Sequence, residues 1–185
     1  MKICSYSLKN LSSKLEDFKL IHHIKLVLQT LLLLCIIKLM HLISGGDYMI
    51  KLFAGEKGMG KTRQLIAMAN EHLNITEGHI VFIDDDNRNI HELHRNIRLV
   101  DTQEYPIITY REFVTCIYGM LSQNSDISEI FIDSLTNVIQ NLSNQDLTDL
   151  LDALERISTD WDVNFFITLN CNPSELPERA KAAMV

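Results

Sequence analysis

The sequence lacks the cysteine and histidine patterns that bind zinc or cross-link secreted proteins. Its four cysteines lie far apart and form no C-x-x-C pair, so neither a zinc site nor a disulfide framework is expected. The H-E-x-x-H pattern is also absent. His91 and His94 fall on a segment where we expect a helix, and we interpret them as surface residues rather than metal ligands. The cysteines fit the reduced thiols of a cytosolic protein: Cys4, Cys35, Cys116 and Cys171.

Positive charge is scarce in most of the chain. Residues 49–185 carry eleven basic and twenty-one acidic side chains, whereas residues 1–48 carry six lysines and three acidic side chains. Sequence-independent nucleic-acid binding depends on lysines and arginines that neutralise phosphates. A nucleic-acid partner is therefore disfavoured. No internal repeat or low-complexity linker is present, and the length predicts one main domain, which we place at residues 49–185.

The first 48 residues lack an uncharged apolar run of ordinary membrane-spanning length. Residues 21–43 are strongly apolar, but Lys25 and Lys38 leave only the twelve residues 26–37 uncharged, and a spanning helix needs about 20. Snorkelling of the two lysine side chains would lengthen this stretch, so a marginal membrane-associated helix is one interpretation. An A-x-A-like cleavage site is missing, which disfavours a cleaved signal peptide.

The residues just before Met49 suggest a different origin for this apolar extension. Gly45, Gly46 and Asp47 are compatible with the codons GGA-GGT-GAT, a bacterial ribosome-binding sequence at a suitable distance from an ATG. We therefore expect translation to start at Met49, with residues 1–48 being upstream DNA read in frame. The alternative is a genuine N-terminal amphipathic or anchoring helix, the only route to a membrane that the sequence offers.

Glycine is also scarce, with seven residues, and three of these fall in one octapeptide. Residues 55–62, Gly-Glu-Lys-Gly-Met-Gly-Lys-Thr, fit the phosphate-loop pattern G-x-x-x-x-G-K-(S/T). The glycines let backbone N–H groups converge on phosphate oxygens. Lys61 is expected to reach the β- and γ-phosphates as a catalytic residue, and the Thr62 hydroxyl to ligate Mg²⁺. The candidate nucleotide-binding residues are Gly55, Glu56, Lys57, Gly58, Met59, Gly60, Lys61, Thr62 and Arg63.

The surroundings of this octapeptide favour a nucleotide site over a glycine-rich turn. An apolar strand is expected at residues 48–54, directly before the loop. A helix is expected to start at Lys61, which would direct its positive dipole end toward bound phosphates. Its apolar residues share one face: Leu65, Ile66, Met68, Ala69 and Leu73.

A second strand, expected within residues 78–84, is followed by more carboxylates. Asp84, Asp85 and Asp86 come at its carboxyl end, which is where ligands bind in open α/β sheets. The alternative is a solvated turn in which one aspartate caps a helix around residues 89–96. At most one of the three aspartates is expected to be catalytic.

Two later strands also end in polar residues. The strand expected within residues 127–135 leads into Asp133, which would orient Mg²⁺ through water; the alternative is that Asp133 caps the next helix. The strand at residues 163–169 ends at Asn170, a candidate γ-phosphate sensor or a turn residue before Pro173.

The remaining segments complete an alternating pattern of strands and helices. Residues 97–100 predict a short strand, and Thr109 is expected to cap a helix over residues 109–121 whose core face includes Met120. Further helices are expected at residues 147–157 and 173–184. This alternation predicts an α/β fold with a parallel sheet covered by helices on both faces.

Over residues 50–172 the chain resembles the RecA-type branch of the P-loop NTPases. Residues 130–134, Ile-Phe-Ile-Asp-Ser, are similar to the second nucleotide motif of that family, and residues 167–170 to its sensor strand. Residues 81–86 resemble the strand that ends in the catalytic glutamate, so the resemblance assigns Asp86 that catalytic place. The chain departs from the family in having an aspartate there, no long DNA-binding loops, and no obvious arginine finger after Asn170; Arg179 is the only late arginine.

The chain also resembles short, poorly characterised bacterial ATP-binding proteins. Together these features lead to three hypotheses about its function. The first is a cytosolic Mg²⁺-dependent ATP-binding protein with weak ATPase activity. The second is a nucleotide-gated interaction module with negligible hydrolysis, acting through a protein partner or a second copy. The third is a small-molecule kinase, disfavoured because no lid with several arginines is evident. A GTPase is disfavoured because the sequence lacks Asn-Lys-x-Asp.

Overall fold

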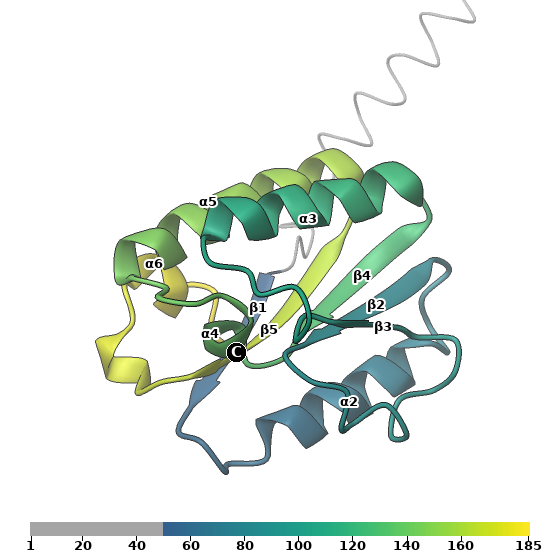
Figure 1. The fold of residues 1–185 in the computed structure, drawn as a ribbon, viewed down its shortest axis with the longest axis horizontal. Coiled ribbons are helices and arrows are strands. Elements are labelled where there is room, and N and C mark those ends of the chain that lie inside the picture. The colour runs from purple at the N-terminus through teal and green to yellow at the C-terminus, as the bar shows by residue number, and fades with distance from the viewer. Residues whose placement is uncertain (1–49) are drawn as a thin grey trace, which may run out of the picture. The chain divides into compact units, whose positions relative to one another are not determined.

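The computed structural model describes residues 50–185 (Figure 1). The two interpretations of residues 1–48, a later translation start and a membrane-associated helix, concern residues outside this range. Tyr48 and Met49 of the expected first strand also lie outside it. Among residues 50–185, no helix combines the length and the apolar character needed to cross a membrane.

Within residues 50–185, five strands form one sheet in which every paired neighbour is parallel. The order across the sheet is β1-β5-β4-β2-β3, so the last strand in the chain lies between the first and the fourth. This confirms the predicted fold class. The strands are β1 (Ile50–Gly55), β2 (His79–Asp84), β3 (Arg98–Asp101), β4 (Ile127–Ile132) and β5 (Asn164–Asn170).

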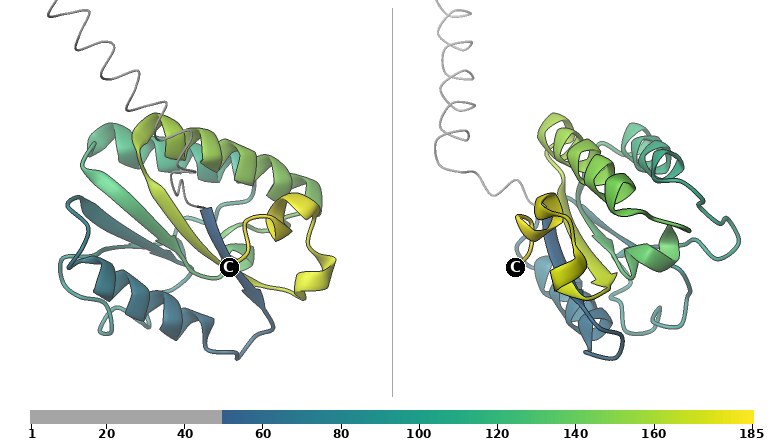
Figure 2. Two further views of the ribbon diagram at one scale, coloured as in Figure 1. Left: turned by 180° about the vertical axis from the view of Figure 1, so that it is seen from behind. Right: turned by 90° about the vertical axis from the view of Figure 1, so that its left-hand side faces the viewer.

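Helices cover both faces of the sheet. The helix α2 (Lys61–His72) lies on one face, whereas α3 (Tyr110–Gln123) and α5 (Asn144–Trp161) lie side by side on the other (Figures 1 and 2). Three short elements connect or close the chain: α4 (Leu135–Val138), the 3₁₀ turn η1 (Pro173–Glu175) and α6 (Glu178–Lys181).

Each face of the sheet buries its own apolar cluster. Under α2, Phe131 and Phe166 stack with ring centroids 4.5 Å apart, and Phe82 stacks on Phe131 from the next strand. The helical spacing of apolar residues predicted the buried faces of α2, α3 and α5. Met68, Leu73 and Met120 are only partly buried, since they lie at the margins of those faces.

Local capping fixes where the two long helices on the second face begin. Thr109 accepts a hydrogen bond from the backbone N–H of Glu112, and the Glu112 carboxylate accepts one from the Thr109 N–H. Ser143 and Asp146 form the same reciprocal capping box at the start of α5. Such boxes pair N–H groups that a helix start leaves without partners. The predicted cap at Thr109 is confirmed.

The helix expected around residues 89–96 is wrong. Residues 85–97, which we call the strap, are a series of turns between β2 and β3. Asn70 of α2 explains this, because its side chain donates to the Glu92 carbonyl oxygen (2.8 Å) and accepts from the His94 N–H (2.8 Å). Asp86 accepts from the Arg88 N–H (2.9 Å). Asn70 thus binds two backbone groups that a helix over residues 89–96 would pair internally.

The single closing helix expected over residues 173–184 is also wrong, because the segment divides into η1 and α6. Pro177 lies at the break; it has no N–H to donate and disfavours helical geometry at Leu176. The last residues instead pair with β1: the Leu52 N–H donates to the Ala183 oxygen (2.8 Å), and the Val185 N–H donates to the Leu52 oxygen (3.2 Å).

Candidate functional site

The carboxyl ends of four adjacent strands surround a cavity of about 530 Å³. The phosphate loop follows β1, and the polar residues predicted after β5, β4 and β2 form neighbouring parts of the wall. The strap contributes the remaining side. The loop residues lining the cavity are Lys57, Gly58, Gly60, Lys61, Thr62 and Arg63, whereas Gly55, Glu56 and Met59 belong to the loop without lining it.

Two glycines of the phosphate loop have the positive φ angles that the glycine-rich sequence predicts. Gly58 has φ of 93° and Gly60 has φ of 83°, in the left-handed region that a side chain disfavours. Lys61 folds back over the loop, where its ammonium donates to the carbonyl oxygens of Gly55 (2.9 Å) and Glu56 (2.8 Å). A lysine ammonium has three donors, so one remains for a ligand in the cavity.

Asp133 joins the phosphate loop to the neighbouring strand. Its carboxylate accepts hydrogen bonds from the Thr62 hydroxyl (2.7 Å) and, through the other oxygen, from the Thr168 hydroxyl (2.6 Å). The alternative that Asp133 caps the next helix does not hold, because Ser134 is the residue at the start of α4. The two sequence motifs, 71 residues apart, thus meet at one carboxylate.

Ser134 and Asn170 form the next part of the wall. Ser134 has a left-handed backbone (φ 47°), and its N–H donates to the Thr168 hydroxyl oxygen (2.7 Å). The Asn170 amide donates to the Ser134 hydroxyl (3.0 Å), so Asn170 faces the cavity.

Sequence reasoning missed Thr168, which contacts both Asp133 and Ser134. It is a polar residue between apolar neighbours in its strand, and it is only 1% exposed. The signal was present, because side chains two residues apart on a strand point to the same face, and Thr168 is two residues before the cavity-facing Asn170.

Replacing Thr168 with valine is expected to destabilise the protein by about 1–3 kcal/mol, because the isosteric change leaves the buried Ser134 N–H and an Asp133 oxygen without their partner. Urea unfolding would measure the loss. Thr168→Ser keeps the hydroxyl and serves as the control. A Thr168→Val variant no less stable than Thr168→Ser would contradict this account.

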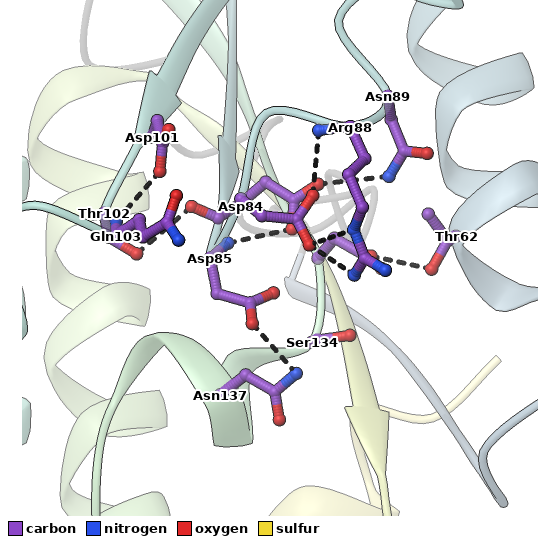
Figure 3. Close-up of polar contacts among 12 residues, drawn as sticks. Thr62, Asp84, Asp85, Arg88, Asn89, Asp101, Thr102, Gln103, Ser134 and Asn137 are labelled. Carbon is purple, nitrogen blue, oxygen red and sulfur yellow. Dashed lines mark hydrogen bonds and ion pairs between the residues drawn. The ribbon is translucent and has the colours of Figure 1, made fainter.

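Asp84, the last residue of β2, and the two aspartates that follow it have three different environments. Figure 3 shows Asp84 and Asp85. Asp84 is 2% exposed and accepts from the Asp85 N–H (2.8 Å) and the Asn89 amide (3.3 Å). Burial, reinforced by the nearby Asp133 carboxylate, raises the pKa of Asp84 to about 7. No local pattern distinguished Asp84 from its neighbours, since its burial depends on the strands and strap packed around it.

The other two aspartates of this cluster are already paired. Asp85 accepts from the Asn137 amide of α4 (3.2 Å). Asp86 is bound by the Arg88 guanidinium (Nε to Oδ2, 2.6 Å), which lowers the pKa of Asp86. Asp86 therefore lines the cavity as an ion-paired carboxylate.

The oxygen groups around the cavity fit magnesium chemistry. Within residues 50–185, no three histidine, cysteine or acidic side chains are grouped to hold a metal on their own. Mg²⁺ beside a nucleotide needs only one or two protein oxygens, since phosphates and waters supply the rest. The Thr62 hydroxyl and the Asp133 carboxylate are two such oxygens, and they are already in contact.

Comparisons with known proteins identify the fold. The flagellar accessory protein FlaH from Methanocaldococcus jannaschii is similar in structure, with a TM-score of 0.51 over 73% of this chain. The fold is RecA-like. The sequence identity is 14%, so the similarity concerns the fold alone, and the match covers 66% of the FlaH chain, just under two thirds. No protein-family model and no curated protein matches the sequence.

The RecA-like fold confirms the resemblance at the level of architecture. In this RecA-like sheet, β1, β5, β4 and β2 are adjacent, so the phosphate loop, Asn170, Asp133 and the aspartates after β2 follow one another around the cavity.

Proposed function

We propose that this protein binds ATP with Mg²⁺ and hydrolyses it slowly to ADP, inorganic phosphate and a proton. The observation that carries this proposal is the 2.7 Å hydrogen bond between the Thr62 hydroxyl and the Asp133 carboxylate. It joins the phosphate-loop threonine to the acid of the second motif, the pair that holds Mg²⁺ in P-loop enzymes. A site for ATP implies a cytosolic location, where this nucleotide is abundant.

Each cavity residue then has a proposed task. The loop N–H groups and Lys61 hold the phosphates, and Thr62 with Asp133 would hold Mg²⁺. When bound, the ion would offset the charge that develops on the phosphate oxygens. Asp86 orients the attacking water, and Asn170 contacts the γ-phosphate.

Two features support slow turnover. Asp86 is one methylene shorter than the glutamate it replaces in the resemblance, and it is bound to Arg88. Arg179, the late arginine, is engaged on α5 by Asp152 (2.8 Å) and Glu155 (2.7 Å), and it does not line the cavity.

The second candidate function is a nucleotide-gated interaction module. It is favoured by the bond between Asn137 and Asp85, which ties α4 to the wall of the cavity. Beyond α4 the chain borders a second cavity of about 460 Å³, lined by residues that include Ile139 and Tyr110. A nucleotide that shifts α4 would thereby reshape a surface for a protein partner or a second copy.

The proposal is tested with the full chain and its Asp133→Asn variant, by calorimetric titration and by phosphate release. The native chain is expected to bind ATP more tightly with Mg²⁺ than without it. In the variant the ratio of the ATP affinity with Mg²⁺ to that without it is expected to fall by about tenfold or more, because the carboxylate charge near the ion is missing. Asp126→Asn, an exposed aspartate before β4, is the control. Equal ATP affinity with and without Mg²⁺ in the native chain would contradict the proposal, and binding without turnover would favour the interaction module.

A further inference from the structure

The strap that borders the cavity has a buried apolar anchor at one end and is held at the other by side-chain hydrogen bonds of Asp85, Asp86 and Asn89. Leu93 and Ile97 are buried under α2, and Asn70 grips the backbone at Glu92 and His94. Residues 86–91 span the gap between this anchor and the end of β2. Arg88 lies in the middle of that span and lines the cavity.

The guanidinium of Arg88 is turned back toward the carboxylates at the end of β2 (Figure 3). Its Nε and one terminal nitrogen both contact a single oxygen of Asp86, Oδ2. The Arg88 side chain is 83% exposed, whereas that of Asp86 is 17% exposed. Because the Arg88 guanidinium is mostly exposed to solvent, its ion pair with Asp86 is weak, and Arg88 can exchange this partner for another at little cost.

The charge distribution of the wall indicates what the new partner is. On the side formed by the end of β2 and the strap, the carboxylates of Asp84, Asp85, Asp86 and Glu92 line the cavity. Among the described residues of that side, Arg88 is the one lysine or arginine that lines it. A phosphate that approaches this wall from the phosphate loop meets acidic side chains that repel it unless Arg88 turns toward it. Guanidinium groups bind phosphate through two parallel hydrogen bonds, a better match than one carboxylate oxygen.

We propose that Arg88 leaves Asp86 to bind the terminal phosphate of a nucleoside triphosphate, and that this exchange frees Asp86 to accept a hydrogen bond from the attacking water. The inference rests on the proposed ATP site. It makes Arg88 a reader of the third phosphate, which a nucleoside diphosphate lacks. It also means that Asp86 becomes available only when a triphosphate is present.

The test compares affinities for an ATP analogue with a non-cleavable β–γ bridge and for ADP, each with Mg²⁺, in the full chain. Arg88→Ala is expected to weaken binding of the triphosphate analogue by about 10–100-fold, since its charge-assisted contact is lost. The affinity for ADP is expected to change by less than about twofold. Arg88→Lys is expected to bind the analogue with an affinity between those of the native chain and Arg88→Ala, because lysine keeps the charge but loses the paired hydrogen bonds. Arg95→Ala is the control, since Arg95 is exposed on the same strap and does not line the cavity.

The variant Asp86→Asn separates this exchange from a merely structural ion pair. Without its carboxylate partner Arg88 is already released, so the triphosphate analogue is expected to bind several-fold more tightly while ATP turnover falls. A structural pair would instead make Arg88→Ala and Asp86→Asn weaken binding alike, and that result would overturn the inference. An unchanged ratio of triphosphate to diphosphate affinity in Arg88→Ala would overturn it while leaving the proposed function intact. A native chain that binds no nucleotide overturns both.

Discussion

Lys61→Ala is expected to weaken ATP binding by at least about a hundredfold without unfolding the protein. In the structure the Lys61 ammonium donates to two carbonyl oxygens of the phosphate loop and keeps one donor for a phosphate. Alanine removes the positive charge and also the bridge that holds the loop closed. Charge-assisted hydrogen bonds contribute about 1.5–3 kcal/mol each, so losing both effects reaches that hundredfold range.

Calorimetric titration of the variant with ATP and Mg²⁺ checks this prediction, with circular dichroism to verify the fold. Lys181→Ala is a matched control, since Lys181 pairs with Glu178 on α6, away from the cavity. ATP affinity that is unchanged in Lys61→Ala would contradict the nucleotide site itself.

Asp84→Asn is expected to stabilise the protein at pH 8 in buffer without nucleotide or Mg²⁺. Burial and the Asp133 carboxylate raise the pKa of Asp84 from 3.8 to about 7 in the folded state. The folded protein therefore binds more protons than the unfolded chain between those values, and its stability falls as the pH rises from about 4 to 7. A pKa difference of this size corresponds to a loss of at most about 4 kcal/mol in the free energy of unfolding when Asp84 ionises.

Urea unfolding at pH 5 and pH 8 measures the effect. The stabilisation by Asp84→Asn should be larger at pH 8 than at pH 5, because the native carboxylate is charged in its buried position only at the higher pH. Asp160→Asn, on the exposed side of α5, should give no pH-dependent difference. A gain in stability that is equal at both pH values would show that packing, rather than charge, explains the variant.

Local sequence patterns predicted most of the elements and the loop around which the cavity forms. The apolar periodicity of α5, the Thr109 cap and the apolar run of β4 all act within a few residues, so they can be recognised without the fold. The order of the strands is different. Nothing in β5 alone indicates that it lies between β1 and β4, because that placement depends on contacts over more than 100 residues.

The remaining differences arise where distant side chains decide the local structure. The sequence predicts a helix within the strap, but Asn70, from another element, binds the backbone groups that a helix needs. Asp84 and Asp86 are only two residues apart, and the packing of the strands and the strap buries Asp84 while Asp86 stays partly exposed. Thr168 has its function through Asp133 and Ser134, which are more than 30 residues away.

The contacts of Thr168 and Asn170 have a mechanical consequence for the cavity. Besides the backbone hydrogen bonds between the strands, these two side chains of β5 form three hydrogen bonds with Asp133 and Ser134, the residues directly after β4. The opposite wall is joined to them by the Asp85–Asn137 bond and continues into the strap. The cavity thus has one rigid wall, formed by the ends of β4 and β5, and one wall that can move, formed by the strap. Any opening and closing of the cavity is expected to be motion of residues 85–91 relative to Asp133.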